Sequence, residues 1–410
     1  MSNRTYDIIV YGATSFVGQI LTRYMTDHCG VDNGVNWAIA GRSATKLEEL
    51  KNSLGESAAS LPMVVADADD QVALAAIAQS TKVVITTVGP YALYGESMVK
   101  VCAENGTDYC DLCGEAYWIK RMIQTYADTA KQTGARLVSC CGFDSIPSDL
   151  GTHFLQQQGK TRFGKYFSSV KLGVNAMKGG ASGGTLASMI EAIKAAKADP
   201  KLRRDMNNPY SLCPEREDLK QPQVSIKSPT YDPDFKAWSA PFIMEAINAR
   251  VVLRSNLLQD MGYGETFLYR EQMLTGKGLK GRLSALALTL GLGLFALGVI
   301  VTPIRSLLQR FVLPKPGEGP SPEAQLTGFF DVSLLGKTED NQQLQVTVTG
   351  DRDPGYGSTA KMLAQSGLCL AFDVSKQECS GGFWTPASSM GDKLIQRLCD
   401  HAGLTFELQE

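Results

Sequence analysis

The chain has 410 residues, of which 44% are hydrophobic, and its 40 basic and 42 acidic side chains leave a net charge of −2. This length predicts two domains with buried cores. The absence of a basic cluster argues against a nucleic-acid-binding protein. The ten cysteines are scattered, the three histidines lack ligand-like spacing, and no signal peptide precedes the first apolar run. We therefore expect a cytoplasmic protein with reduced thiols and no metal site.

Short apolar runs and helix-like segments alternate over residues 1–150. The predicted strands are 6–11, 36–40, 62–66, 82–88, 108–112 and 136–140. The predicted helices between them are 16–25, 44–54, 72–79, 95–104 and 116–131. This alternation indicates an α/β fold with a Rossmann-type, doubly wound parallel sheet.

The pattern changes after Asp149. We expect strands at 167–176, 246–254, 326–335 and 343–349, a helix at 185–198, and an irregular segment over 200–241. In the last strand Leu344, Val346 and Val348 alternate with polar residues, as in a half-buried antiparallel strand. Residues 151–352 are therefore predicted to form an α+β domain on a mixed or antiparallel sheet, for substrate binding and dimerisation. Residues 353–410 are predicted to form helices that pack back on the first domain.

An uncharged segment of 22 residues, 283–304, lies between Arg282 and Arg305 and is long enough to span a membrane. A single span would separate the two halves of one sheet domain, so we reject it. Two interpretations stay open: a buried or dimer-interface helix, or a monotopic hairpin that dips into a membrane. The four prolines of 314–322 make a stiff exit and favour membrane or lipid contact.

The segment Tyr6–Gly18 predicts a nucleotide site. A β-branched run ends in a glycine turn and a helix-like segment follows, an order that forms a cradle for a pyrophosphate. Ser15 occupies the middle position of a G-x-x-G-x-x-G spacing, where a residue with negative φ fits and its hydroxyl could bond a phosphate. The alternative is an ordinary strand-to-helix turn. The predicted cofactor-binding residues here are Gly12, Ala13, Thr14, Ser15, Phe16, Val17 and Gly18.

The end of the second predicted strand favours NADP(H) over NAD(H). It carries no acid between Asn36 and Ala44 to bond a ribose 2′-hydroxyl, and Arg42 would meet a 2′-phosphate instead. Ser43 and Lys46 could assist. Asp67, at the end of the third strand, could touch the adenine or cap a loop.

Two later strand ends supply candidate groups beside the nicotinamide. Val88, Gly89 and Pro90 follow the fourth strand, where glycine permits close backbone approach, and Tyr91 and Tyr94 are candidate proton donors or packing residues. Asp144 and Ser145 follow the last strand of the first domain. They are candidate catalytic groups, although Ser145 could simply cap the helix that Pro147 opens.

Several segments together resemble the saccharopine dehydrogenase-like oxidoreductases, in particular the trans-acting enoyl reductase branch. They cover nearly the whole chain: 12–18, 40–43, 88–96, 109–115, 141–151, 182–185, 353–360 and 384–388. The resemblance implies a Rossmann domain followed by an α/β domain, and NAD(P)H-dependent reduction. For the enoyl branch it implies a lipid-like or acyl substrate, which fits the apolar segment 283–304.

Two other functions stay open. A saccharopine-type amino-acid dehydrogenase would need basic residues for substrate carboxylates, and the candidates are Arg250, Arg254, Arg270 and Lys178. A non-catalytic, lipid-associated protein that binds NADP is the third interpretation. The glycine-rich loop 179–184 could bind a second phosphate or act as a hinge or tight turn. We also expect a homodimer, in peripheral contact with a membrane if residues 283–304 meet lipid.

Overall fold

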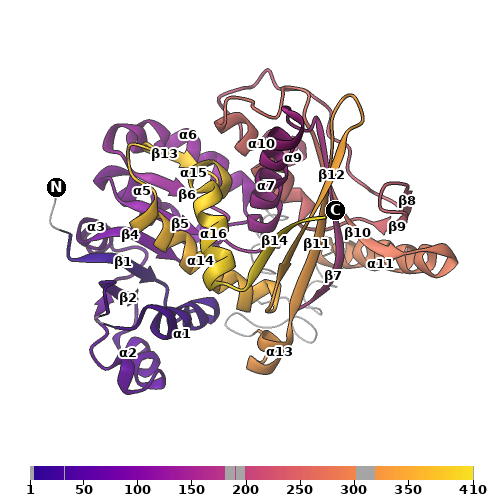
Figure 1. Cartoon of the computed structure of the whole chain (residues 1–410). Coiled ribbons are helices and arrows are strands. Elements are labelled where there is room, and N and C mark those ends of the chain that lie inside the picture. Colours follow the sequence, from indigo (N-terminus) through magenta and orange to yellow (C-terminus); the bar gives the residue numbers. More distant parts are fainter. Residues whose placement is uncertain (1–3, 32, 181–189, 191–198, 302–318, 410) are drawn as a thin grey trace. The chain divides into compact units, whose positions relative to one another are not determined.

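The structure is a computed structural model that describes residues 4–31, 33–180, 190, 199–301 and 319–409 (Figure 1). The chain divides into two compact units. Unit 1 comprises Met1–Ile146 and Tyr356–Ala402, and unit 2 comprises Pro147–Gly355 and Gly403–Glu410. Residues 356–402, which include the C-terminal helices, therefore belong to unit 1, and the last residues belong to unit 2.

Unit 1 contains a parallel sheet of seven strands in the order β13-β6-β5-β4-β1-β2-β3. The chain moves outward from β1 to β2 and β3, then returns to build the other half from β4 onward. The strands are β1 (Tyr6–Tyr11), β2 (Trp37–Gly41), β3 (Met63–Val65), β4 (Thr81–Thr86), β5 (Asp108–Asp111), β6 (Arg136–Val138) and β13 (Gly382–Trp384). This arrangement confirms the predicted doubly wound sheet.

Helices surround this sheet, and the central strands are buried on both faces. Ile8, Ile9, Val10, Val84 and Ile85 have no exposed surface, which explains their continuous apolar runs. The helices are α1 (Phe16–Cys29), α2 (Ala44–Ser53), α3 (Gln71–Ser80), α4 (Tyr91–Tyr94), α5 (Glu96–Asn105), α6 (Ala116–Thr133), α14 (Thr359–Leu368), α15 (Pro386–Ser389) and α16 (Gly391–His401).

Unit 2 contains a mixed sheet of seven strands in the order β14-β12-β11-β7-β10-β9-β8. Only β7 and β10 run parallel, and the other pairs are antiparallel, in agreement with the predicted mixed sheet. The strands are β7 (Ser169–Lys178), β8 (Thr230–Asp232), β9 (Ala237–Ala240), β10 (Leu268–Gly276), β11 (Phe329–Lys337), β12 (Gln343–Gly350) and β14 (Leu404–Gln409).

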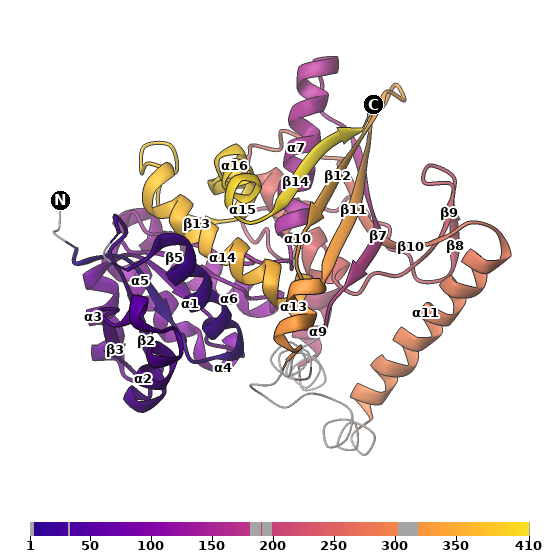
Figure 2. The same ribbon diagram turned by 60° about the horizontal axis from the view of Figure 1, so that its bottom comes forward.

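The helices of unit 2 differ in how they meet this sheet. Helix α7 packs on β11 and β12, because a side chain at Gly151 would contact Leu334 and Val348. Helix α11, in contrast, extends away from the sheet in both views (Figures 1 and 2). The helices are α7 (Ile146–Phe163), α9 (Pro200–Asn207), α10 (Glu245–Leu258), α11 (Gly278–Ile300) and α13 (Pro322–Thr327).

The predicted strand 246–254 is wrong, because these residues lie in helix α10. The β-branched pair Val251 and Val252 suggested a strand, but the helix is buried on nearly all sides and its polar groups find partners. Asn248 donates to Glu271 on β10 at 2.9 Å, and Arg250 donates to Ser211 at 2.9 Å. Tertiary packing thus overrides local propensity. The predicted helix 185–198 lies outside the described residues, except for residue 190.

Candidate active site

The loop after β1 has the geometry that a pyrophosphate requires. Gly12 has a φ of +86°, a conformation that side chains disfavour. A Cβ at Gly18 would lie 2.2 Å from the carbonyl oxygen of Gly12, so only glycine allows the first turn of α1 to approach the loop this closely. Both outer glycines of the predicted motif are therefore required by the backbone.

Ser15, in the middle position, caps α1. Its φ is −69°, and its hydroxyl oxygen accepts the amide of Gly18 at 2.9 Å. The Thr87 hydroxyl donates to the Gly12 carbonyl at 2.9 Å, so the Ser15 hydroxyl is the donor in its 2.8 Å bond to Thr87. The single proton of Ser15 is therefore engaged with Thr87 in this structure, and the phosphate contact of this hydroxyl stays a prediction. Sequence reasoning did not identify Thr87, the residue that connects this loop to β4.

The backbone amides of the loop are the better anion ligands. Phe16 and Val17 open α1, so their N–H groups have no acceptor within the helix and point toward its N-terminal end. The positive end of the helix dipole adds to them. The loop follows β1, which is adjacent to β4 at the point where the strand order reverses. Dinucleotides bind beside this crevice in open α/β sheets.

The end of β2 lies next to this loop, since a Cβ at Gly41 would be 3.7 Å from Oγ1 of Thr14. Arg42 is exposed there and forms no hydrogen bond or ion pair that the structure describes. Ser43 caps α2, because its hydroxyl accepts the amide of Lys46 at 3.3 Å. Arg42 is thus the group at this strand end that is available to an incoming anion, and Lys46 is exposed nearby.

Asp67 follows β3, and its carboxylate accepts the amide of Asp69 at 3.2 Å. It therefore caps its own loop, which was one of the two predicted roles. The adjacent acids affect Tyr11, whose pKa is raised well above the ordinary value by burial first and then by Asp67 and Asp69.

After β4 the chain passes through Val88, Gly89 and Pro90. A Cβ at Gly89 would meet only ordinary contacts, the nearest atom being 3.5 Å away on Tyr91. The packing around this position therefore does not itself require glycine. The amide of Val88 donates to the Thr86 hydroxyl at 3.2 Å, which fixes this turn.

The two candidate tyrosines differ in their surroundings. The hydroxyl of Tyr91 donates to the Thr86 carbonyl at 3.1 Å and accepts the amide of Leu112 at 3.2 Å. Burial raises the pKa of this phenol well above its usual value. Tyr91 therefore joins the ends of β4 and β5, whereas Tyr94 exposes 46% of its surface.

Glu115 has a structural task at the same place. Its buried carboxylate accepts the amides of Tyr91 and Ala92, both at 2.9 Å. This caps the N-terminus of α4 with a negative charge, where the helix dipole favours it. Glu96 is likewise engaged, since it pairs with Arg121 at 2.9 Å.

Asp144 and Ser145 lie at the same carboxyl edge of the sheet, beyond β6. The Asp144 carboxylate is beside Gly114, and Ser145 is fully buried with a φ of +119°. Cys140, five residues earlier, also has a positive φ of +64°. Non-glycine residues in such conformations concentrate at functional sites.

A buried carboxyl group at this edge, Asp111, is absent from the predicted site. Its oxygens accept the Tyr109 hydroxyl at 2.8 Å, the amide of Cys113 at 2.9 Å and the Ser139 hydroxyl at 3.2 Å. Burial outweighs these donors and raises the pKa of Asp111 to about 6. The signal was its position at the end of a buried strand, inside the segment 109–115.

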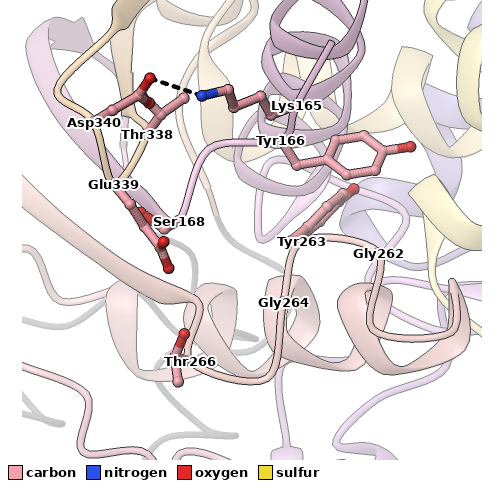
Figure 3. A pocket seen from close by; sticks show the side chains of 10 residues that line it. All are labelled: Lys165, Tyr166, Ser168, Gly262, Tyr263, Gly264, Thr266, Thr338, Glu339 and Asp340. Atoms are coloured by element: carbon pink, nitrogen blue, oxygen red, sulfur yellow. Dashed lines mark hydrogen bonds and ion pairs between the residues drawn. The ribbon is translucent and has the colours of Figure 1, made fainter. Parts of the chain in front are cut away.

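A shallow hollow of about 360 Å³ lies in unit 2, among the loops at the amino ends of β7 and β10 (Figure 3). Lys165 pairs with Asp340 at 2.7 Å on one side, and the rings of Tyr166 and Tyr263 meet edge to face at 5.8 Å on the other. No predicted catalytic or cofactor-binding residue lines it, so it is not part of the candidate site.

The basic residues considered for substrate carboxylates are used by the protein. Arg254 binds the Leu212 carbonyl and pairs with Glu215 at 3.2 Å, and Arg270 pairs with Asp232 at 2.8 Å. Arg250 is bound to Ser211 and to two backbone carbonyls. Lys178 donates to the Thr327 hydroxyl at 3.3 Å.

Comparison with known proteins agrees with this geometry. Residues 8–138 match the family model of the saccharopine dehydrogenase NADP-binding domain. The chain is 36% identical over 408 residues to a trans-acting enoyl reductase of Mycobacterium ulcerans, with 97% of this chain and 96% of the relative covered. It is 37% identical over 410 residues to a trans-acting enoyl reductase of Mycobacterium bovis, with the same coverage.

A solved structure shows the same fold. Apo saccharopine dehydrogenase (L-Glu forming) from Saccharomyces cerevisiae superimposes with a TM-score of 0.55 at 14% sequence identity, covering 98% of this chain and 99% of that one. At this identity the likeness concerns the fold alone.

The dinucleotide fold and the loop after β1 define an NAD(P)H-dependent oxidoreductase, and the NADP-binding family model covers that loop. Within this class the chain belongs to the saccharopine dehydrogenase-like oxidoreductases, in the trans-acting enoyl reductase branch. The predicted family is therefore confirmed.

Proposed function

We propose that the protein uses NADPH, in preference to NADH, to reduce a carbon–carbon double bond conjugated to a carbonyl group in a lipid-like acyl substrate. The observation that carries the cofactor preference is the exposed Arg42 beside the loop after β1, at a strand end without an acid. The names of relatives that align with 97% of the chain support enoyl reduction.

The residues of unit 1 suit this chemistry. When bound, the cofactor supplies a hydride to the β-carbon of the substrate. The amides of Phe16 and Val17 bind the pyrophosphate, and Arg42 binds the 2′-phosphate. Gly89, which has no side chain, follows β4, where the nicotinamide half would approach the backbone. Tyr94 is our candidate for protonating the α-carbon, because its phenol is exposed while that of Tyr91 is engaged.

The amino-acid dehydrogenase alternative is weakened by a specific finding. A substrate with several carboxylates needs free basic side chains to bind it, but Arg250, Arg254 and Arg270 are already bonded within unit 2. Using Arg250 or Arg254 for a substrate would take a donor from the backbone carbonyls that they bind, at a cost of about 1–3 kcal/mol. An uncharged acyl chain makes no such demand.

Calorimetric titration with NADPH and NADH tests the cofactor preference. Arg42→Ala should weaken NADPH binding by about 10–100-fold, because a charge-assisted contact contributes about 1.5–3 kcal/mol, and should leave NADH binding unchanged. Arg23→Ala, an exposed arginine on α1, is the matched control and should bind both as the unchanged protein does. Equal losses for NADPH and NADH in the Arg42 variant would contradict the proposal.

Turnover separates the three functions. We expect NADPH to be oxidised with trans-2-enoyl thioesters of long chain length, and no NADP⁺ reduction with saccharopine. The reverse result would establish the amino-acid activity. NADPH binding without oxidation by any enoyl thioester would favour the non-catalytic interpretation.

A further inference from the structure

Helix α11 presents a large apolar surface to its surroundings. It is the one described helix long and apolar enough to cross a membrane, yet only 17% of its most apolar stretch is buried (Figure 2). Leu290 is 58% exposed and Leu294 is 70% exposed. Contiguous exposed apolar surface of this kind marks an interaction site. The surface is formed chiefly by Leu283, Leu286, Leu290, Leu294, Leu297 and Ile300.

The exposed surface is wide rather than a narrow stripe. Ala285 and Val299 are buried and lie on one side of the helix, whereas Ala287, Gly291 and Ala296 are exposed in addition to the leucines. At 3.6 residues per turn, these exposed positions span roughly two thirds of the circumference. A single partner helix covers only a narrow seam, so a medium that surrounds the helix fits this surface better than a second copy of the chain.

Residues that favour a membrane–water interface gather at the N-terminal end of α11, on the helix itself and on the adjacent strands β8 and β9. The guanidinium of Arg282 lies over the ring of Trp238 at 5.3 Å, and Tyr231 meets Trp238 edge to face at 5.8 Å. Tyr231, Lys277 and Lys280 are exposed. Tryptophan and tyrosine concentrate at the level of lipid headgroups, where cations are also favourable.

The sequence around α11 is entirely without acidic residues. Residues 272–317 contain no Asp or Glu, although they contain six basic residues: Lys277, Lys280, Arg282, Arg305, Arg310 and Lys315. Anionic lipid headgroups attract such a segment by about 1 kcal/mol for each Lys or Arg near the surface. The charge pattern therefore complements an anionic membrane surface.

The topology of unit 2 determines from which side α11 could enter a membrane. Strand β10 runs parallel to β7, and β11 runs antiparallel to β7. The last residues of β10 and the first residues of β11 therefore lie beside the same end of β7. Met273 pairs with Val174, and Phe329 pairs with Lys178. The chain thus leaves the sheet and returns to it on one side, which is compatible with insertion from one side and incompatible with a single crossing.

We propose that α11 inserts from one side into an anionic lipid bilayer, with Trp238, Tyr231 and the lysines at its N-terminal end in the headgroup layer. This contact places the enzyme at a membrane whatever its substrate is, so it does not depend on the proposed function. NADPH titration should give the same affinity for every variant below.

Flotation of the full chain with vesicles tests this inference. We expect binding to vesicles of phosphatidylcholine with phosphatidylglycerol, and at least tenfold weaker partitioning for Leu290→Glu combined with Leu294→Glu. The control is Val72→Glu on α3, where the side chain is 81% exposed. Lys277→Gln with Lys280→Gln should lower partitioning about 25-fold on the anionic vesicles only. A wild-type chain that stays with the unbound fraction would overturn the inference.

A second measurement does not depend on the α11 variants. Brominated lipids should quench the tryptophan fluorescence of the unchanged chain, and Trp238→Phe should remove most of the quenching, because Trp37 and Trp118 are buried and Trp384 lies on β13 of unit 1. Light scattering tests the alternative that a second copy of the chain covers α11. If the leucine variants change a dimer into a monomer while vesicle binding stays the same, α11 is a subunit interface and the inference is wrong.

Discussion

The two tyrosines after β4 show how neighbouring residues of one type take different tasks. Tyr91 is buried and its hydroxyl is bonded on both sides, whereas Tyr94 is exposed on the same short helix. Residues three apart lie near the same side of a helix, so the difference comes from tertiary contacts: the Tyr91 hydroxyl is bonded at the ends of β4 and β5. Sequence alone gave both tyrosines the same two interpretations.

Tyr91→Phe should therefore affect mainly the stability of the protein, and Tyr94→Phe mainly its turnover. Losing the Tyr91 hydroxyl leaves the Leu112 amide without its acceptor, so we expect a loss of about 1–3 kcal/mol in the free energy of unfolding and little change in kcat. Losing the Tyr94 hydroxyl should lower kcat by about 10²–10⁴-fold without changing the melting temperature. Melting curves and turnover with an enoyl thioester check both, and unchanged kcat in the Tyr94 variant would remove it as the proton donor.

Asp111 should make unit 1 less stable as the pH rises. Its pKa is raised from 3.8 to about 6 by burial, so between these values the folded chain binds more protons than the unfolded chain. The contribution of Asp111 to the free energy of unfolding is fully present below pH 3.8 and is lost as the pH rises to about 6. Its size is roughly 3 kcal/mol.

Asp111→Asn is the matched variant for this effect. The asparagine oxygen can still accept the amides of Cys113 and Cys140, and the hydroxyls of Tyr109 and Ser139 can rotate to accept its NH₂ group. Denaturant unfolding at pH 4.5 and pH 7 should show the pH dependence reduced in the variant. Equal slopes for both proteins would show that Asp111 titrates as an ordinary carboxyl group.

At the level of elements, Arg136 connects β6 to the C-terminal segment. Its buried guanidinium pairs with Asp108 on β5 at 2.5 Å and donates to the carbonyls of Leu370 and Val374 at 2.7 and 2.6 Å. Lys376 also binds Asp108. These bonds fix the segment that leads from α14 to β13.

Arg136→Ala should cost about 3 kcal/mol of unfolding free energy, at the lower end for a broken buried pair because Lys376 still neutralises Asp108. Arg121→Ala removes an exposed partner of Glu96 and should cost less than about 1 kcal/mol. Denaturant melts of the two variants give the comparison. A similar small cost for both would mean that the buried pair adds little.

The elements also show which features the sequence determines. The strand–turn–helix units of the first 140 residues were predicted because parallel strands are apolar throughout and alternate with helix-like segments. The structure adds that Ser15, Ser43 and Asp70 cap three of these helices. Helix α10 was not, because its polar side chains are satisfied by distant residues. Strand β13 has three residues, too few for a pattern. Strand β14 alternates Leu404, Phe406 and Leu408 with polar residues, a signal that was present but was not used.

At the candidate site, the sequence indicates those features that the backbone determines. The positions of Gly12 and Gly18 follow from their contacts, and the exposed Arg42 lies where the strand pattern placed it. Hydrogen-bond partners could not be predicted, because Thr87, Asp111 and Glu115 act across strands that are distant in sequence.

For the whole molecule, β14 provides a direct test. Its Phe406 and Leu408 pair with Val348 and Val346 on β12, which would become an open edge without it. Ending the chain after Ala402 should make unit 2 sensitive to limited proteolysis while NADPH binding in unit 1 is kept. Glu407→Ala, an exposed position on the same strand, should behave as the full chain does. Loss of NADPH binding upon truncation would contradict this expectation.

The distribution of the last residues also affects biosynthesis. Strand β13 completes one sheet and β14 completes the other, and both lie within residues 382–409. Neither sheet can gain its outermost strand until this stretch has been made, so the two units complete their folding together rather than one after the other during synthesis.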